Sequence, residues 1–139
     1  MLQYLFDTDH LTLFDHRHAA LRQRFGSAPA GSVGISPITI QECLKGRLAA
    51  LARHQRGALQ VQAYRNLVES VALFQQFPVV PFDAACESRW QQLRGLRLKV
   101  GTQDLKIAAV ALVNQLVLLT RNRQDFNRIP GLTLDDWTV

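Results

Sequence analysis

The sequence predicts an α/β fold in which a parallel sheet carries helices on both of its faces. Short apolar segments alternate with longer segments of helical periodicity along the 139 residues, as parallel strands joined by crossover helices require. Acidic residues follow several of these apolar segments, at the strand ends where open α/β sheets bind ligands. A chain of this length folds as one domain, so we expect a single domain over residues 1–139.

The composition is that of a globular protein with an excess of basic residues. Hydrophobic residues make up 47% of the chain, charged residues make up 19%, and the formal net charge is +5. The chain shows no signal-peptide pattern and no apolar run near the ~20 residues that span a bilayer. Cys43 and Cys86 are far apart and have no zinc-site spacing. We therefore expect a cytoplasmic protein, without membrane contact, that has an anionic partner.

Turn residues and periodicity locate the elements of the first half. Ser36 and Pro37 form an N-cap followed by proline at the first helical position. The helix that begins there has apolar residues at positions 40, 44, 48 and 51, on one face. The elements expected in order are a strand at 2–6, helices at 10–15 and 18–25, a loop at 26–32, a strand at 33–35, a helix from 37 and a helix at 57–76.

The second half shows the same alternation. Asp83 is a candidate N-cap, and Gly101 precedes a helix whose residues 107–113 are apolar all round, which predicts a position at the centre of the fold or at a subunit interface. The elements expected in order are a strand at 77–82, helices at 84–98 and 105–114, a strand at 116–120, a turn at 130–131 and a strand at 132–134.

Four acids fall at comparable places in this arrangement. Asp7 follows the first strand, Glu42 lies on the helix after the second, Asp104 begins the apolar helix, and Asp125 follows the strand 116–120. Crowded carboxylates repel one another unless a cation neutralises them, and oxygen donors favour Mg²⁺ or Mn²⁺. Such a site can activate water for attack on a phosphoryl centre. Separate roles are the alternative, because Asp7 suits a helix N-cap and Asp104 suits a helix dipole.

Basic residues are concentrated in two parts of the sequence. A run without any acid contains Lys45, Arg47, Arg53, Arg56 and Arg65. Such a run forms a solvated surface more often than a binding patch. The second group, which we consider as candidate phosphate contacts, consists of Arg94, Arg97, Lys106 and Arg121. The four histidines show no ligand or triad spacing, so we expect surface or packing roles for them.

Six segments together resemble a known family. They are Leu5-Phe6-Asp7-Thr8-Asp9, residues 35–42, residues 101–109, Leu119-Thr120-Arg121-Asn122-Arg123-Gln124-Asp125-Phe126, Pro130-Gly131-Leu132 and Asp136-Trp137. In this order and spacing they resemble PIN-domain ribonucleases, and among these the VapC-type toxins of bacterial toxin–antitoxin pairs. The resemblance implies a three-layer α/β/α sandwich, Mg²⁺- or Mn²⁺-dependent endonucleolytic cleavage of RNA, a homodimer, and a cognate antitoxin whose C-terminal tail covers the active site.

The resemblance also assigns roles to individual residues. The residues that match the three core metal-binding acids of the family are Asp7, Glu42 and Asp104. The fourth acid varies in position within the family, and this chain has Asn122 at one of the two places, so the resemblance gives the fourth role to Asp125 and leaves Asn122 as a polar helper. Asp9 stands where many relatives have asparagine, which leaves its role open. Thr120 is expected to shape the pocket by hydrogen bonding.

Two other functions are compatible with parts of the sequence. Asp7-Thr8-Asp9 after a strand also resembles the nucleophile motif of haloacid-dehalogenase-like phosphatases, with Thr120 at the threonine position. That chemistry needs a lysine after Thr120, which is absent, and it gives Glu42 and Asp104 no role. The other alternative is a basic RNA-binding module that does not cut, although a binder of phosphate has no use for clustered acids.

Overall fold

A four-stranded parallel sheet forms the middle layer of the computed structural model, which describes residues 1–139. The strands are β1 (Tyr4–Phe6), β2 (Val33–Gly34), β3 (Val117–Leu119) and β4 (Leu134–Asp135). They lie in the order β2-β1-β3-β4, and every pairing is parallel. β1 is therefore central, with Leu5 opposite both Gly34 and Leu118. The predicted parallel sheet is confirmed.

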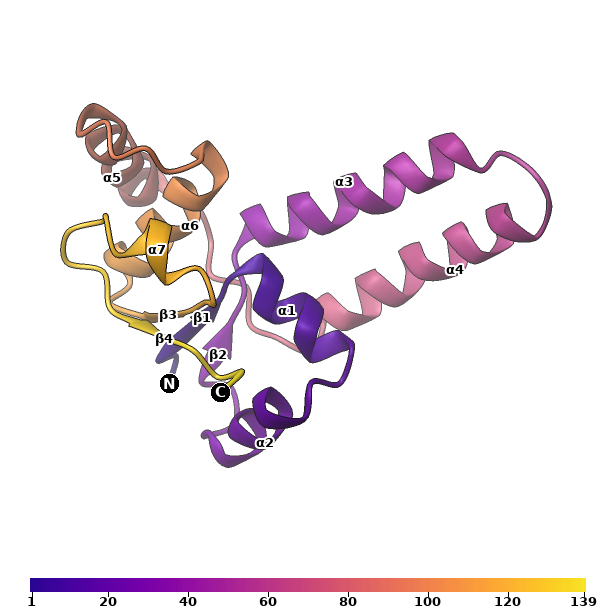
Figure 1. The fold of residues 1–139 in the computed structure, drawn as a ribbon, viewed down its shortest axis with the longest axis horizontal. Coiled ribbons are helices and arrows are strands. Elements are labelled where there is room, and N and C mark those ends of the chain that lie inside the picture. Colours follow the sequence, from indigo (N-terminus) through magenta and orange to yellow (C-terminus); the bar gives the residue numbers. More distant parts are fainter.

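Seven helices surround this sheet, and two of them extend away from it. They are α1 (Thr8–Asp15), α2 (Ala19–Ser27), α3 (Pro37–Arg53), α4 (Gly57–Phe74), α5 (Ala84–Gly95), α6 (Thr102–Val113) and α7 (Arg123–Phe126). Figure 1 shows α5, α6 and α7 on one side of the sheet and α1 and α2 on the other. α3 and α4 lie side by side as a protruding pair, which we call the arm (Figure 1). None of these helices is both long and apolar enough to cross a membrane.

The alternation of side chains along the strands creates two separate cores. Leu5 and Leu118 belong to a cluster that contains the buried residues of α5 and α6. Phe6 and Leu119, one position later on each strand, belong to a second cluster with Leu11 of α1. Successive strand residues face opposite sides of a sheet, so each strand contributes to both cores. This packing produces the predicted three-layer sandwich.

The apolar helix α6 is buried inside the chain. Its buried residues are Leu105, Ile107, Ala108, Ala109, Val110 and Ala111. Their burial against the sheet and α5 explains why this helix is apolar all round. The central position that the sequence predicted is confirmed, and the composition of α6 needs no subunit interface. Cys43 and Cys86 are both free.

The predicted strand at 77–82 is wrong. This segment forms only a single bridge between Ile35 and Val79, although its backbone follows β2 through bonds from the Ile35 N–H to Pro78 O (3.0 Å) and from the Val80 N–H to Ile35 O (2.9 Å). Pro78 and Pro81 have no N–H to donate, so the ladder cannot continue through them.

Several predicted helix and strand boundaries also differ from those in the structure. The helix predicted to end at residue 98 ends at Gly95, because Arg97 and Lys99 have φ angles of 52° and 57°, outside the helical region. The helix predicted from residue 105 begins at Thr102, and the last strand lies at Leu134–Asp135 instead of 132–134.

The approach of the 77–80 segment to β2 depends on a glycine. A Cβ atom at Gly34 would lie 2.9 Å from Val80 Cγ2, 3.0 Å from Leu2 Cδ2 and 3.1 Å from the carbonyl oxygen of Pro78. A side chain at this position would push the segment away from the sheet, because part of the obstruction is backbone.

We therefore expect Gly34→Ala to lower the free energy of unfolding by about 1–3 kcal/mol, the usual cost of overpacking. Urea denaturation measures this loss. Gly26→Ala is the matched control, because a Cβ atom there meets nothing within 4 Å, and alanine should stabilise that helical position by up to ~1 kcal/mol. Equal stabilities for the two variants would contradict the steric argument.

Candidate active site

A pocket opens where β1 and β3 end. Its volume is about 650 Å³. The residues that line it are Asp7, Thr8, Asp9, Glu42, Asp104, Arg121, Asn122 and Phe126. They come from the β1–α1 junction, α3, α6 and the segment after β3, which is the edge of the sheet where the sequence predicted a ligand site.

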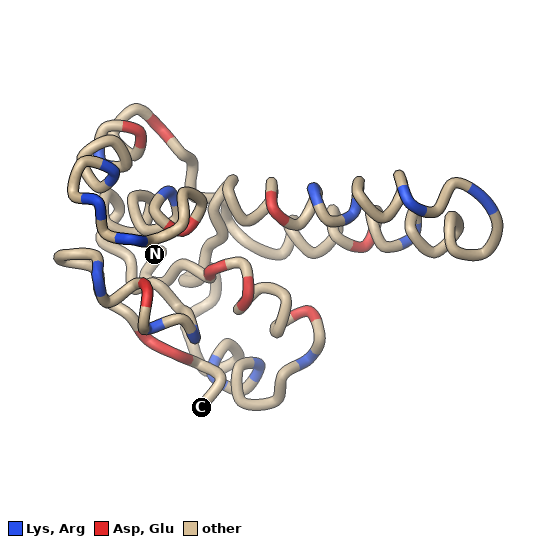
Figure 2. The backbone as a smooth tube through the Cα atoms, turned by 45° about the horizontal axis from the view of Figure 1, so that its top comes forward, with Lys and Arg blue, Asp and Glu red and all other residues tan.

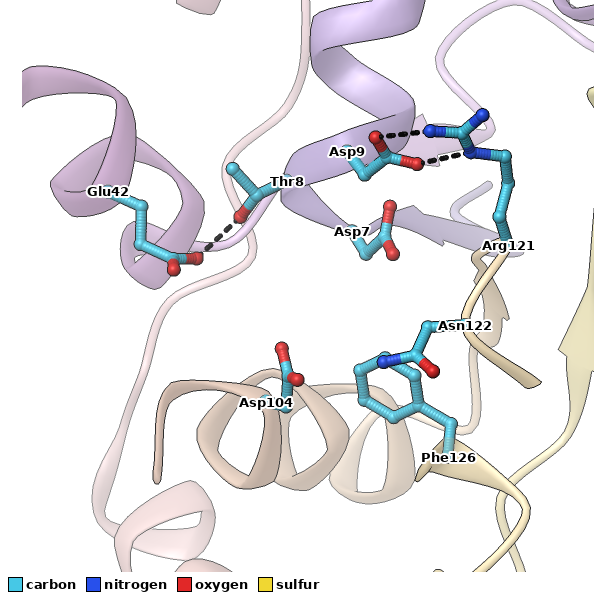
Figure 3. A pocket seen from close by; sticks show the side chains of 8 residues that line it. All are labelled: Asp7, Thr8, Asp9, Glu42, Asp104, Arg121, Asn122 and Phe126. Atoms are coloured by element: carbon cyan, nitrogen blue, oxygen red, sulfur yellow. Dashed lines mark hydrogen bonds and ion pairs between the residues drawn. The ribbon is translucent and has the colours of Figure 1, made fainter. Parts of the chain in front are cut away.

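Three of the four predicted acids face one another across this pocket. Figure 3 shows the carboxylates of Asp7, Glu42 and Asp104 arranged around one open space, each on a different element. Burial raises the pKa of Asp104 to about 6, and the negative charges of Glu42, Asp7 and Asp125 add to this effect. The pocket is therefore a site of concentrated negative potential.

Asp7 has a structural role as well as a place in the pocket. Its Oδ1 accepts a hydrogen bond from the backbone N–H of His10 (2.7 Å), which makes Asp7 the N-cap of α1. The sequence left open whether Asp7 caps a helix or faces a ligand site. The structure shows that this residue does both, because a strand end and a helix start coincide here.

Thr8 holds Glu42 in the pocket. The Thr8 hydroxyl lies 2.6 Å from Glu42 Oε1, to which it donates, and 3.0 Å from the hydroxyl oxygen of Thr39, a residue with no exposed surface. Sequence reasoning gave no role to Thr8. The sequence did contain a signal for this role. Thr8 is a hydroxyl residue between two acids, in the first turn of a helix that begins at the sheet edge where the acids lie.

Arg121 and Asp9 form an ion pair at the rim. Arg121 Nε and Nη2 donate to the two carboxylate oxygens of Asp9 at 2.7 and 2.9 Å. These bonds and the charge of Asp9 raise the pKa of Arg121 above its ordinary value. Arg121 was predicted as a phosphate contact, and it is the only one of the four candidates that lines the pocket.

The remaining phosphate candidates lie elsewhere. Arg94 and Lys106 sit over the ring of Trp90, at 4.9 and 4.8 Å from its centroid. Arg97 is exposed in the turn after α5. None of these three residues lines the acidic pocket, so their positions give no support to a role in binding the reacting phosphate.

Asn122, rather than Asp125, lines the pocket after β3. Asp125 Oδ2 accepts a hydrogen bond from Asn122 Nδ2 (3.0 Å), and its Oδ1 lies 3.6 Å from Arg128 Nη1. Thr120 is fully buried, and its hydroxyl oxygen accepts a bond from the Asn122 N–H (2.9 Å). The predicted fourth acid is thus directed at its neighbours, although its charge still contributes to the raised pKa of Asp104.

A buried histidine lies behind Asp7. His10 has no exposed surface, its Nε2 accepts a bond from the Trp137 N–H (3.2 Å), and its Nδ1 lies 3.5 Å from Asp7 Oδ1. His10, Asp7 and Asp9 offer ligand atoms within 4.8 Å of one another. However, the bond to Trp137 occupies one nitrogen of the ring. The packing role expected for the histidines therefore describes His10, which also orders the C-terminal residues.

The donor set of the pocket suits a hard divalent cation. Such cations take oxygen ligands, and carboxylates compensate for the loss of hydration. The uncompensated charge around Asp104 supplies the electrostatic driving force for cation binding.

Comparison with known proteins identifies the fold. The sequence model of the PIN-domain family matches residues 4–132. The chain belongs to the PIN-domain family. Among its relatives, the tRNA(fMet)-specific endonuclease VapC of Shigella flexneri is 27% identical over 99% of this chain and 100% of that protein. Ribonuclease VapC1 of Rickettsia felis is 32% identical over 73% of this chain and 74% of that protein.

Solved structures agree with these relatives. VapBC from Salmonella typhimurium, crystallised with DNA, matches with a TM-score of 0.80 and 26% identity, over 99% of both chains. This PIN domain is therefore a ribonuclease of the VapC type, as the sequence motifs predicted. The family excludes the phosphatase hypothesis, and membership among ribonucleases disfavours a module that binds RNA without cutting it.

The raised pKa of Asp104 predicts how stability depends on pH. The folded protein keeps the Asp104 proton up to about pH 6, whereas the unfolded chain releases it near 3.8. Between about pH 3.8 and pH 6 the folded state therefore binds more protons than the unfolded state. The metal-free protein loses stability as the pH rises through this window.

We expect Asp104→Asn to remove this loss. Above pH 6, in EDTA, the variant should be more stable than the parent by on the order of 1 kcal/mol, allowing for solvent screening of a half-exposed group. The difference should vanish towards pH 4. Urea unfolding between pH 4 and 8 measures it, and a variant less stable than its parent at every pH would show that Asp104 is a structural acid.

Proposed function

We propose that this PIN domain hydrolyses RNA phosphodiester bonds with Mg²⁺ or Mn²⁺ held by Asp7, Glu42 and Asp104. The observation that supports this proposal most strongly is the arrangement of three carboxylates around one pocket. Burial and the charges of Glu42 and Asp7 raise the pKa of Asp104, as expected where acids are crowded. A bound divalent cation would supply an activated water and would neutralise charge on the phosphoryl group.

The other pocket residues would orient the acids and the substrate. Thr8 holds Glu42 through its hydroxyl, which fixes the direction of one carboxylate in the absence of metal. The backbone N–H of His10 holds Asp7 Oδ1 and leaves Oδ2 for the pocket. Arg121, fixed by Asp9, places a positive charge at the rim, where it would attract the phosphate backbone of RNA.

We assign Asp125 an indirect role in this mechanism. Its carboxylate accepts a bond from the side-chain amide of Asn122, and the Asn122 side-chain oxygen accepts a bond from the Asp125 N–H (3.3 Å). The amide group of Asn122 is therefore held at the wall of the pocket. There it would contact the substrate or a water molecule, and Asp125 would act through it.

The proposed biological context is that of a toxin in the cytoplasm. The matching structures include DNA-bound VapBC from Salmonella typhimurium and a toxin–antitoxin complex from Klebsiella pneumoniae. By analogy, we propose a cognate antitoxin that covers the acidic pocket, and a homodimer. An exposed apolar stripe on α4, formed by Val61, Tyr64, Val68 and Val71, supports association with another protein surface.

Substitution of the acids tests the metal site. Loss of a residue that only supports a metal ligand lowers metal affinity or activity about 10–100-fold. Loss of a ligand itself should cost more, so we expect Asp104→Asn and Glu42→Gln to reduce RNA cleavage by more than about 100-fold. The parent should cut only with Mg²⁺ or Mn²⁺, and excess EDTA should abolish cleavage. Glu69→Gln, an exposed acid on α4, is the control and should cut normally. Undiminished cleavage in EDTA would overturn the metal assignment.

A second substitution tests the role of Thr8. Thr8→Val removes the hydroxyl that holds Glu42 but retains the shape of the side chain, so we expect the Mg²⁺ concentration for half-maximal cleavage to rise about 10-fold or more. Thr12→Val is the matched control, because its hydroxyl donates only to the backbone oxygen of Thr8. An equal change in both variants would indicate a general effect on α1 instead of an effect on the site.

A further inference from the structure

A groove adjoins the acidic pocket on the side of the arm. It lies between α1, α3 and α4, has a volume of about 430 Å³, and shares Thr8 and Glu42 with the pocket. We call it the arm groove. Leu73 and Phe74 contribute an apolar floor, and both are buried. Because the two hollows share the hydrogen-bonded pair of Thr8 and Glu42 as a common wall, a polymer held at the acids can pass over this pair into the arm groove.

Two arginines line this groove, Arg47 and the exposed Arg53, and only Arg47 is held by a side-chain hydrogen bond. Its Nε donates to the hydroxyl oxygen of Ser70 (2.8 Å), and Ser70 is only 5% exposed. None of the ion pairs of the chain includes Arg47, although Asp15 and Glu42 also line the groove. The side chain is half-buried, and its two terminal nitrogens carry donors without a protein carboxylate.

This arrangement differs from that of an ordinary solvated arginine. The bond from Nε to Ser70 fixes the plane of the guanidinium group, and burial reduces competition from water. The basic run from Lys45 to Arg65 was expected to form a solvated surface, and Figure 2 shows basic residues distributed along the arm. Arg47 is an exception, because it is fixed within a hollow beside the acids. A planar, fixed guanidinium group suits a phosphate, whose oxygens accept paired donors.

We propose that the arm groove binds the nucleotide adjacent to the scissile phosphodiester, with Arg47 contacting its phosphate and the apolar floor contacting its base or sugar. This inference rests on the proposed ribonuclease function, which places the scissile phosphodiester at the acids. Single-stranded RNA is commonly bound by apolar surfaces beside basic groups that follow the backbone. A strand whose reacting phosphate lies at Asp7 and Asp104 therefore places its next nucleotide past Thr8 and Glu42, in the arm groove.

An acidic protein segment would also be attracted by Arg47. The contact with the acidic pocket favours RNA, because Glu42 and Asp15 line the groove and would repel a peptide that carries several carboxylates. In the RNA complex, the cation proposed at the acids would neutralise Glu42 as well. The experiments below separate the two partners.

The first experiment replaces Arg47 and measures cleavage of a fluorescein-labelled single-stranded RNA of twelve nucleotides. We expect Arg47→Gln to raise the RNA concentration for half-maximal single-turnover cleavage about 10-fold, with the maximal rate changed less. The slope of log affinity against log salt should fall by about 0.7, the value for one lost phosphate contact on a single strand. Arg47→Lys should restore part of the slope. Arg65→Gln, which is exposed on α4, is the control.

The second experiment fills the arm groove without disturbing the fold. Gly46 lines the groove on α3, and a Cβ atom there would meet nothing within 4 Å. Gly46→Ala and Gly46→Leu should both melt at or above the temperature of the parent, because glycine is unfavourable within a helix. Only the leucine variant, whose side chain can occupy the groove, should require more RNA for half-maximal cleavage, by about 5- to 10-fold.

Failure of this inference and failure of the ribonuclease proposal give different results. Fluorescence anisotropy with the same RNA measures binding even when no cleavage occurs, so loss of binding in Arg47→Gln and Gly46→Leu would still support the arm groove. Cleavage by the parent, with unchanged RNA dependence and salt slope in both variants, would overturn the inference. Arg47 would then bind a protein carboxylate or serve only in the packing of the arm.

Discussion

The junction at Asp7, where β1 becomes α1, determines the geometry of the whole site. The Asp7 N–H donates to the carbonyl oxygen of Leu119 (3.1 Å), so it extends the pairing of β1 with β3, and the Asp7 carbonyl oxygen accepts from the Leu11 N–H (3.1 Å) in the first turn of α1. The side chain caps the same helix. Strand, helix and carboxylate are thus fixed by a single residue, which leaves little freedom for the direction of the acid.

The other acids reach this position through the packing of separate layers. Glu42 is carried by α3, which begins at the Ser36 cap after β2, and Asp104 is carried by α6, whose buried residues belong to the core that also contains those of α5. Bringing their charges together opposes folding in the absence of a cation, and the buried apolar surface of the two cores compensates for this opposition. A protein site of this kind trades stability for a strong field at one place.

The sequence predicted the parts of this site that depend on local order. Strand ends, caps such as Ser36 and Asp83, and the positions of the three acids follow from residues within a few places of one another. It could not predict contacts between distant segments. The bond from Thr8 to Glu42 joins residues 34 positions apart, and that from Arg47 to Ser70 joins residues 23 apart. Asp125 is a different case, because its partners Asn122 and Arg128 are only three residues away, and the direction of its side chain follows from the turn of α7.

The fastening of the C-terminal residues has a practical consequence for handling the protein. The Trp137 N–H bonds to His10, which packs behind Asp7, and the Trp137 indole lies against Tyr4 with ring centroids 4.8 Å apart. Val139, two residues later, is 84% exposed. An affinity tag joined after Val139 therefore extends into solvent, whereas trimming the chain before Trp137 would uncover the aromatic core and release the histidine behind the acid.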